Sequence, residues 1–250
     1  MTGIASHGRS WITRVKLSPT GQKLITRLNT FMISNLGVRV TSATALGPEK
    51  RWFDRLLSFQ RLLDMVQDVD GDVVECGVAW GESLSMLASL VRSGTMSRHI
   101  YGFDSWGGLP SPSKEDLAST NSVAVEGRFA GKIGLVLSTL RRYGFDDADI
   151  SERITLVKGL FSDTLPHYPG RPIALLHIDV DIYQSYKECL QYLWPKVSVG
   201  GVVLFDEYHL DDIWPGAKKA VDEFFQALAP GSARLEQDPL VAKYYAVKLA

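Results

Sequence analysis

The sequence predicts an α/β protein with a doubly wound, mostly parallel sheet and a C-terminal antiparallel hairpin. Two features lead to this fold class. Five short apolar runs alternate with segments of helical periodicity, which is the pattern of strands joined by crossover helices. Near the C-terminus, two runs of alternating polarity at 232–238 and 242–248 are separated at Asp238-Pro239, which is typical of a hairpin.

Length and composition narrow the classes of function. The chain has 250 residues, of which 45% are hydrophobic, enough for one sizeable core, alone or with an appended segment. Its formal net charge of -1 gives no support to nucleic-acid binding. No apolar run approaches the roughly 18–20 residues of a membrane span, and no signal-peptide core follows the start. We therefore expect a cytoplasmic protein with neither a nucleic-acid nor a membrane partner.

The two cysteines, Cys76 and Cys189, lie far apart within apolar patterns. This placement is typical of buried thiols in a reducing compartment and not of a disulfide framework or a metal site. It agrees with the expected cytoplasmic location.

The first 49 residues differ from the rest in charge. Residues 1–50 carry seven lysines and arginines against one acid, Glu49, a charge of +6 that leaves -7 for the remainder. Their Arg- and Ser-rich start loosely matches an organellar transit peptide, although a basic cover on the domain is the simpler interpretation. We assign 1–49 to a lid or oligomer contact and 50–250 to the main domain.

The main domain begins with a helix at 50–69. Its apolar side chains recur at three- and four-residue intervals, so one face packs on the sheet and the aromatic stripe belongs to the core. Gly200-Gly201 is expected to form the turn before the fifth strand, and the polar stretch 111–127 is a candidate active-site loop. Strands are expected at 72–76, 99–103, 153–157, 173–178 and 202–205, with helices at 82–93, 128–143, 183–194 and 216–228.

The stretch 72–83 contains the first candidate ligand site. A short apolar strand ends near Glu75, and Gly77 and Gly81 permit a sharp turn and close approach of a ligand before the next helix begins. Neither the dinucleotide fingerprint nor the P-loop pattern is present, which argues against a phosphate ligand. Glu75 suits a cationic ligand, such as the sulfonium and amino groups of S-adenosylmethionine. A glycine turn with no ligand is the plain alternative.

Asp104 follows the second predicted strand. An acid at this position, about 27 residues after the end of the first strand, can accept hydrogen bonds from both hydroxyls of a ribose. The alternative is an Asx turn, because Asp before Ser and Gly is common in turns.

Four carboxylates follow the fourth and fifth predicted strands, whose ends are neighbours in this fold class. They are Asp179, Asp181, Asp206 and Glu207. Clustered acids either have raised pKa values or bind a cation, and a set of oxygen ligands suits Mg²⁺, or else Mn²⁺ or Ca²⁺. The alternative is that some of them, Asp181 in particular, cap helices.

A divalent ion beside a sulfonium cofactor has a specific use. It would bind a substrate hydroxyl, lower the pKa of that hydroxyl and hold its oxygen in line with the methyl group. A nearby carboxylate or His209 would then take the proton. A surface histidine, or one that only supports the site, is an equally good interpretation of His209.

Five motifs in this order resemble the macrocin O-methyltransferase (TylF/MycF) family. They lie at 71–78, 103–110, 158–166, 178–185 and 205–209, and the resemblance covers about residues 50–248. It implies a class I methyltransferase (Rossmann-like) fold. It also implies that S-adenosylmethionine, commonly with Mg²⁺, serves to methylate sugar hydroxyls on antibiotics and other glycosylated products.

The resemblance also implies roles for individual residues. The methionine part of the cofactor is expected against Glu75, Cys76, Gly77, Gly81 and Ser83. The ribose is expected at Asp104, and the adenine near Ser105, Trp106, Gly159 and Phe161. Asp179 is expected beside the cofactor at the strand tip. The expected metal ligands are Asp181, Asp206 and Glu207, and the expected catalytic residues are Asp179, Asp181 and His209.

Two departures from the family pattern limit these expectations. Relatives often have Asp where this chain has Glu207, and the first 48 residues match no motif. The alternatives are methylation of a phenolic hydroxyl and a non-catalytic module that binds a nucleoside or the cofactor. The missing dinucleotide fingerprint disfavours a nicotinamide oxidoreductase. We expect a small-molecule acceptor with a sugar or glycoside hydroxyl, and a homo-oligomer assembled through the N-terminal part.

Overall fold

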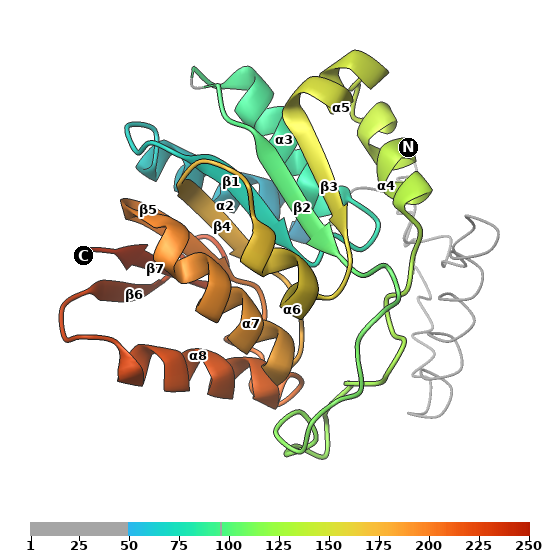
Figure 1. Cartoon of the computed structure of the whole chain (residues 1–250). Coiled ribbons are helices and arrows are strands. Elements are labelled where there is room, and N and C mark those ends of the chain that lie inside the picture. Colours follow the sequence, from blue (N-terminus) through green and yellow to red (C-terminus); the bar gives the residue numbers. More distant parts are fainter. Residues whose placement is uncertain (1–49, 96) are drawn as a thin grey trace, which may run out of the picture.

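The computed structural model describes residues 50–95 and 97–250, which form a seven-stranded sheet with helices on both faces (Figure 1). The strand order is β3-β2-β1-β4-β5-β7-β6. Strands β1 to β5 pair in parallel, whereas β7 is antiparallel to both β5 and β6. The strands are β1 (Asp72–Cys76), β2 (Ile100–Asp104), β3 (Ile154–Lys158), β4 (Ile173–Ile178), β5 (Val197–Phe205), β6 (Ala233–Gln237) and β7 (Tyr244–Lys248).

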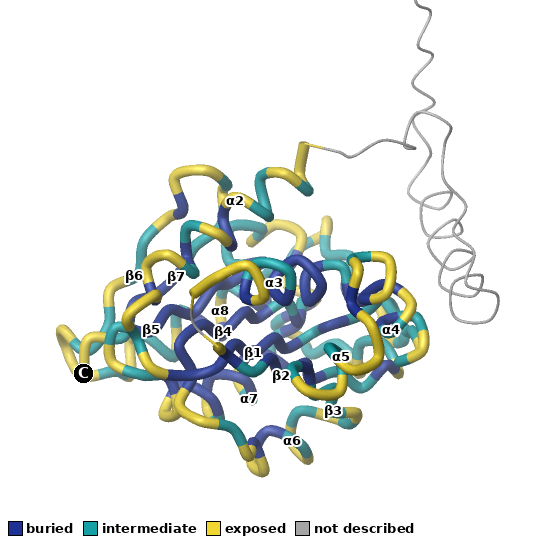
Figure 2. Tube along the Cα trace, turned by 90° about the horizontal axis from the view of Figure 1, so that it is seen from above, coloured by how far each residue is buried: buried dark blue, intermediate teal, exposed yellow. Residues whose placement is uncertain are grey.

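The helices cover the sheet in two apolar layers. On one face, Phe59, Leu87 and Leu140 bring α2, α3 and α4 into one core cluster. On the other face, Tyr186 and Val221 bring α7 and α8 into a second cluster. Figure 2 shows α2 and α3 on the opposite side of the central strands from α6 and α7. The helices are α2 (Lys50–Met65), α3 (Glu82–Ser93), α4 (Ile133–Arg142), α5 (Asp147–Arg153), α6 (Phe161–Thr164), α7 (Tyr183–Leu193) and α8 (Pro215–Ala227), with 3₁₀ turns at η2 (Leu165–His167) and η3 (Trp194–Lys196).

The predicted α/β sheet with a terminal antiparallel hairpin is confirmed. The predicted limits of β1, β4 and α3 agree with the structure, and those of β2 and β3 are shifted by one residue. The predicted helix at 128–143 begins only at Ile133, because residues 128–132 continue the preceding loop. Helices α5 and α6 were not predicted. The expected lid or oligomer segment, 1–49, lies outside the described residues.

Gly200-Gly201 is not the turn before the fifth strand, so that prediction was wrong. Strand β5 begins at Val197 and runs through both glycines, where its pairing with β4 is irregular. Gly200 has a φ of 82°, which glycine adopts without strain. A Cβ on Gly201 would lie 2.8 Å from the Ser198 carbonyl oxygen. Glycine therefore permits a bulge here, and the strand continues.

The long loop 105–132 is held down by a buried acid, Asp116. Its carboxylate accepts hydrogen bonds from the backbone N–H groups of Tyr183 at 2.7 Å and Ser113 at 2.8 Å. Tyr183 begins α7, so the loop is attached to the helix that follows β4. The polar stretch predicted as an active-site loop is thus fixed beside the carboxyl ends of the strands.

Two further expectations from the sequence can be compared with the described residues. Cys76 and Cys189 are both buried and form no disulfide. Within 50–95 and 97–250, no helix is long and apolar enough to cross a membrane.

Asp238 connects the hairpin to α2. Its buried carboxylate accepts hydrogen bonds from Ser58 and Arg61, both at 2.7 Å, and these bonds together with the Arg61 charge lower its pKa although burial raises it. We predict that Asp238→Ala lowers the free energy of unfolding by about 2–3 kcal/mol. Arg61 is partly exposed, so the cost stays below that of breaking a fully buried pair. Chemical denaturation measures this loss, with the exposed Asp68→Ala as control; equal stabilities would contradict it.

Candidate active site at the carboxyl edge of the sheet

A cleft of about 1510 Å³ opens where β1, β2, β4 and β5 end. Strands β1 and β4 are neighbours whose connections leave in opposite directions, which is where open α/β sheets form a ligand crevice. The glycine turn after β1, the end of β2, the loop 105–132, the ends of β4 and β5 and the hairpin turn all contribute to its walls. The cleft is large enough for two small molecules side by side.

The glycine turn brings the end of β1 against the end of β4. Gly77 and Gly81 have φ angles of 87° and 86°. A Cβ on Gly77 would lie 1.7 Å from the Asp179 carbonyl oxygen, so only glycine fits. Helix α3 begins directly after Gly81 and has no side-chain cap, which leaves backbone N–H groups at its start. Gly77 and Ser83 line the cleft, as the sequence suggested.

Glu75 lies within β1 and is fully buried. One carboxylate oxygen is 2.9 Å from Nδ1 of His177, and the other has no hydrogen-bond partner among the described residues. Burial raises the pKa of Glu75, and the hydrogen bond to His177 opposes this effect. Glu75 thus supports the site through His177. Cys76, the next residue, packs in the core with Cys189.

Asp104 ties the end of β2 to the glycine turn. Its two oxygens accept backbone N–H groups from Ala79 at 2.7 Å and from Trp106 at 2.6 Å. Burial raises its pKa, and these two bonds act in the opposite direction. Trp106 is itself buried, and its indole N–H donates to the Ala79 carbonyl oxygen at 2.9 Å. Asp104 lines the cleft, and its carboxylate offers about four lone-pair sites in all, so it can accept further hydrogen bonds.

The other residues expected near the adenine lie around the same half of the cleft. Ser105, Gly159 and Phe161 line it. Gly159 follows β3 and has a φ of 155°.

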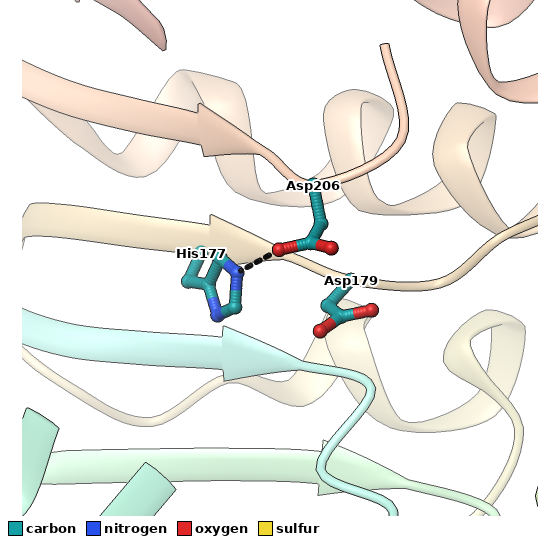
Figure 3. A group of neighbouring side chains, drawn as sticks. All are labelled: His177, Asp179 and Asp206. Carbon is teal, nitrogen blue, oxygen red and sulfur yellow. Dashed lines mark hydrogen bonds and ion pairs between the residues drawn. The ribbon is translucent and has the colours of Figure 1, made fainter. Parts of the chain in front are cut away.

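Asp206 follows β5 and lies beside His177 and Asp179 (Figure 3), and it also contacts two basic side chains. Its oxygens lie 3.1 and 3.2 Å from Nη2 of Arg55, its Oδ1 forms an ion pair with Lys243, and Nε2 of His177 is 3.4 Å away. Burial alone would raise the pKa of Asp206, but the charges of Arg55 and Lys243 and the hydrogen bond to His177 hold it well below its usual range. Asp206 is therefore a carboxylate at neutral pH.

Arg55 and His177 are functional neighbours that the sequence analysis missed. Arg55 also donates to Ser83 Oγ at 2.6 Å and lies 3.7 Å from the Asp179 carboxylate. Burial alone would lower the pKa of His177, but its bonds to Asp206 and Glu75 raise it to about 9. The available signal was a single histidine in the otherwise apolar run 173–178.

The four predicted acids do not form one cluster. Within the described part of the chain, the group with possible ligand atoms all within 4.8 Å of one another is His177, Asp179 and Asp206. Glu207 is buried instead against Tyr186, whose hydroxyl donates to it at 2.7 Å. Asp181 has a φ of 63° and lines the cleft. Burial, and then repulsion from Asp179, raises the pKa of both Asp181 and Glu207 well above the usual range.

His209 lines the cleft two residues beyond Glu207. Its buried Nδ1 has no hydrogen-bond partner among the described residues. Burial lowers its pKa, and the nearby charge of Lys243 acts in the same direction. The imidazole is therefore neutral at physiological pH and can accept a proton.

Comparison with known proteins shows which family the chain belongs to. Residues 51–230 match the model of the family described as macrocin-O-methyltransferase (TylF). The chain belongs to the macrocin-O-methyltransferase family. The resemblance carried by the five sequence motifs is thereby confirmed.

Two named relatives align with part of this chain. Demethyldecarbamoylnovobiocin O-methyltransferase of Streptomyces niveus is 33% identical over 159 residues, which is 63% of this chain and 59% of the relative. A tetracenomycin-C 4'-O-methyltransferase of Streptomyces olivaceus, named for its dimethoxy-rhamnosyl substrate, is 32% identical over 59% of this chain and 56% of its own. The matched part thus spans less than two thirds of either relative.

Solved structures confirm the fold. The calicheamicin methyltransferase CalS11 has a TM-score of 0.68 at 27% identity, with 98% of this chain and 99% of that chain covered. The O-methyltransferase NovP has a TM-score of 0.66 at 24% identity, with 91% and 98% covered. The class I methyltransferase fold of this family is therefore the fold of this chain.

The close contact at Gly77 gives a test of the glycine turn. We predict that Gly77→Ala lowers the free energy of unfolding by more than about 3 kcal/mol or prevents folding, because the new Cβ meets the backbone of β4. The control is Gly134→Ala in α4, where nothing lies within 4 Å of an added Cβ. The control should be neutral or gain up to about 1 kcal/mol. Thermal unfolding of both variants measures the difference, and similar stabilities would argue against a close approach at Gly77.

Proposed function

We propose that this protein is an S-adenosylmethionine-dependent O-methyltransferase that acts on a hydroxyl of a sugar or a glycosylated natural product. The observation that carries the proposal is one cleft with two different halves. One half presents the glycine turn and Asp104, and the other presents Asp179, Asp181 and His209. Membership of the macrocin-O-methyltransferase family and the names of its relatives support the reaction type and the class of acceptor.

The cofactor half fits a nucleoside joined to an amino acid. Asp104 is placed to accept hydrogen bonds from ribose hydroxyls through its remaining lone pairs. Gly77 and Ser83, before and within the start of α3, would hold the methionine part, and Ser105 would border the adenine. Trp106 acts by fixing Asp104, since its own side chain is buried in the core.

The acceptor half provides groups that orient a hydroxyl and remove its proton. S-adenosylmethionine supplies an electrophilic methyl group that the acceptor oxygen attacks in line with the departing sulfur. Asp179 and Asp181 lie at the end of β4 and would hold the hydroxyl beside that methyl group. His209 also lines the cleft, and its imidazole would accept the proton.

We also propose that this site binds a divalent ion, Mg²⁺ or Mn²⁺. Asp179 and Asp206 both line the cleft and offer carboxylate oxygens, the ligands that such ions prefer, so the donor chemistry fits. Glu207 and Asp181 follow the same two strands and would complete the set. His177 belongs to the same group, but both of its ring nitrogens already contact carboxylates, those of Glu75 and Asp206, so we assign the ligand role to the acids. When bound, the ion would lower the pKa of the acceptor hydroxyl.

The cofactor site is tested by titration calorimetry with S-adenosylhomocysteine. We predict binding by the wild-type protein and at least about tenfold weaker binding by Asp104→Ala, because hydrogen bonds to a charged group are lost. Asp68→Ala, an exposed change outside the cleft, is the control and should bind like the wild type. A folded wild-type protein that does not bind would overturn the methyltransferase proposal. Equal binding by Asp104→Ala would remove only its ribose role.

The metal role is tested by activity with and without EDTA and by Asp206→Ala. We expect each treatment to lower methyl transfer by about tenfold to a hundredfold, with Mg²⁺ restoring the EDTA-treated wild type. S-adenosylhomocysteine binding by Asp206→Ala shows that the variant is folded. Activity unaffected by both the substitution and EDTA would refute the metal role.

A further inference from the structure

The positive charges on Asp206 differ in how firmly they are held. Arg55 contacts both Asp206 oxygens and also bonds to Ser83, and His177 is clamped between Asp206 and Glu75 with no exposed side-chain surface. Lys243 reaches Asp206 with a single ammonium group, and its second contact is the Asp206 carbonyl oxygen at 3.4 Å. Lys243 therefore has the contact that is easiest to break.

Lys243 reaches Asp206 from the C-terminal hairpin. It precedes β7, at the end of the turn that begins at Asp238, and its side chain lines the cleft. A lysine side chain is a point charge on a flexible four-carbon stem, whereas a bidentate arginine is fixed by its geometry. Arg55 and His177 are each held by several contacts, whereas the Lys243 ammonium can be displaced from Asp206 more easily.

Asp206 already has cationic partners within the protein. Its Oδ1 lies beside the Lys243 ammonium and 3.1 Å from Nη2 of Arg55. A divalent ion at the Asp206 carboxylate would meet strong repulsion from an ammonium on the same oxygen, because charges interact strongly in a partly buried site. The ion and the ammonium are therefore alternatives.

We propose that Lys243 occupies the place of a divalent cation at Asp206 and must leave Asp206 before the ion binds there. This inference rests on the proposed function, specifically on its metal site. Arg55 and His177 keep Asp206 in position in both states. Lys243 thus sets the affinity of the site for the ion, and its charge makes that affinity weaker than the carboxylates alone would give.

The test is Mn²⁺ binding to the purified full chain, measured by electron paramagnetic resonance at fixed pH and ionic strength. We expect Lys243→Met to bind Mn²⁺ at least about tenfold more tightly than the wild type, because it removes the competing charge and keeps the length of the side chain. Lys243→Arg keeps the charge and should not bind more tightly than the wild type. The control is Lys248→Met in β7, whose ammonium contacts the carbonyl oxygens of Trp194 and Val197 instead.

The outcomes separate this inference from the proposed function. Mn²⁺ binding by Lys243→Met that is equal to or weaker than that of the wild type would overturn the inference. Tighter Mn²⁺ binding by Lys248→Met, by the same factor, would also overturn the inference. Any loss of positive charge from the protein would then explain the effect. Mn²⁺ binding by none of the proteins would overturn it together with the metal role. S-adenosylhomocysteine titration of the same samples then shows whether the methyltransferase proposal survives.

Discussion

The ion-pair network on Asp206 is the interaction on which the site depends. Arg55 arrives from α2, His177 from β4 and Lys243 from the hairpin, so one carboxylate joins a helix, the centre of the sheet and its antiparallel edge. Acids gathered at the ends of β4 and β5 repel one another, and these cations offset that repulsion. The network thereby allows several carboxylates to face one cleft in a stable fold.

Asp206 and Glu207 are adjacent in sequence, but their surroundings shift their pKa values in opposite directions. Asp206 lies among cations and stays ionised, while Glu207 turns to the Tyr186 hydroxyl and has a raised pKa. Both residues border the cleft just after the end of β5, and only their partners differ. Burial and neighbouring charge, and not residue type, decide which acid is available as an anion.

The succession of strands and helices along the chain could be predicted because each element depends on local sequence. An apolar run followed by a glycine or an acid, as at Gly77, Asp104 and Asp179, places these residues at one edge of a parallel sheet. The partners of these acids could not be predicted. His177 faces Glu75 only because β1 and β4 pair in that register. Arg55 meets Asp206 only after α2 has packed on the sheet. Local spacing gives no information on either contact.

The charge of the cleft also depends on whether the C-terminal hairpin has joined the sheet. Strand β7 lies between β5 and β6, although it is the last strand in sequence. Until it pairs with β5, Lys243 is absent from Asp206, and the cleft edge carries one uncompensated negative charge more than in the folded protein. The edge of the sheet that would bind the ligands therefore has its full set of cationic partners only when the C-terminal hairpin is in place.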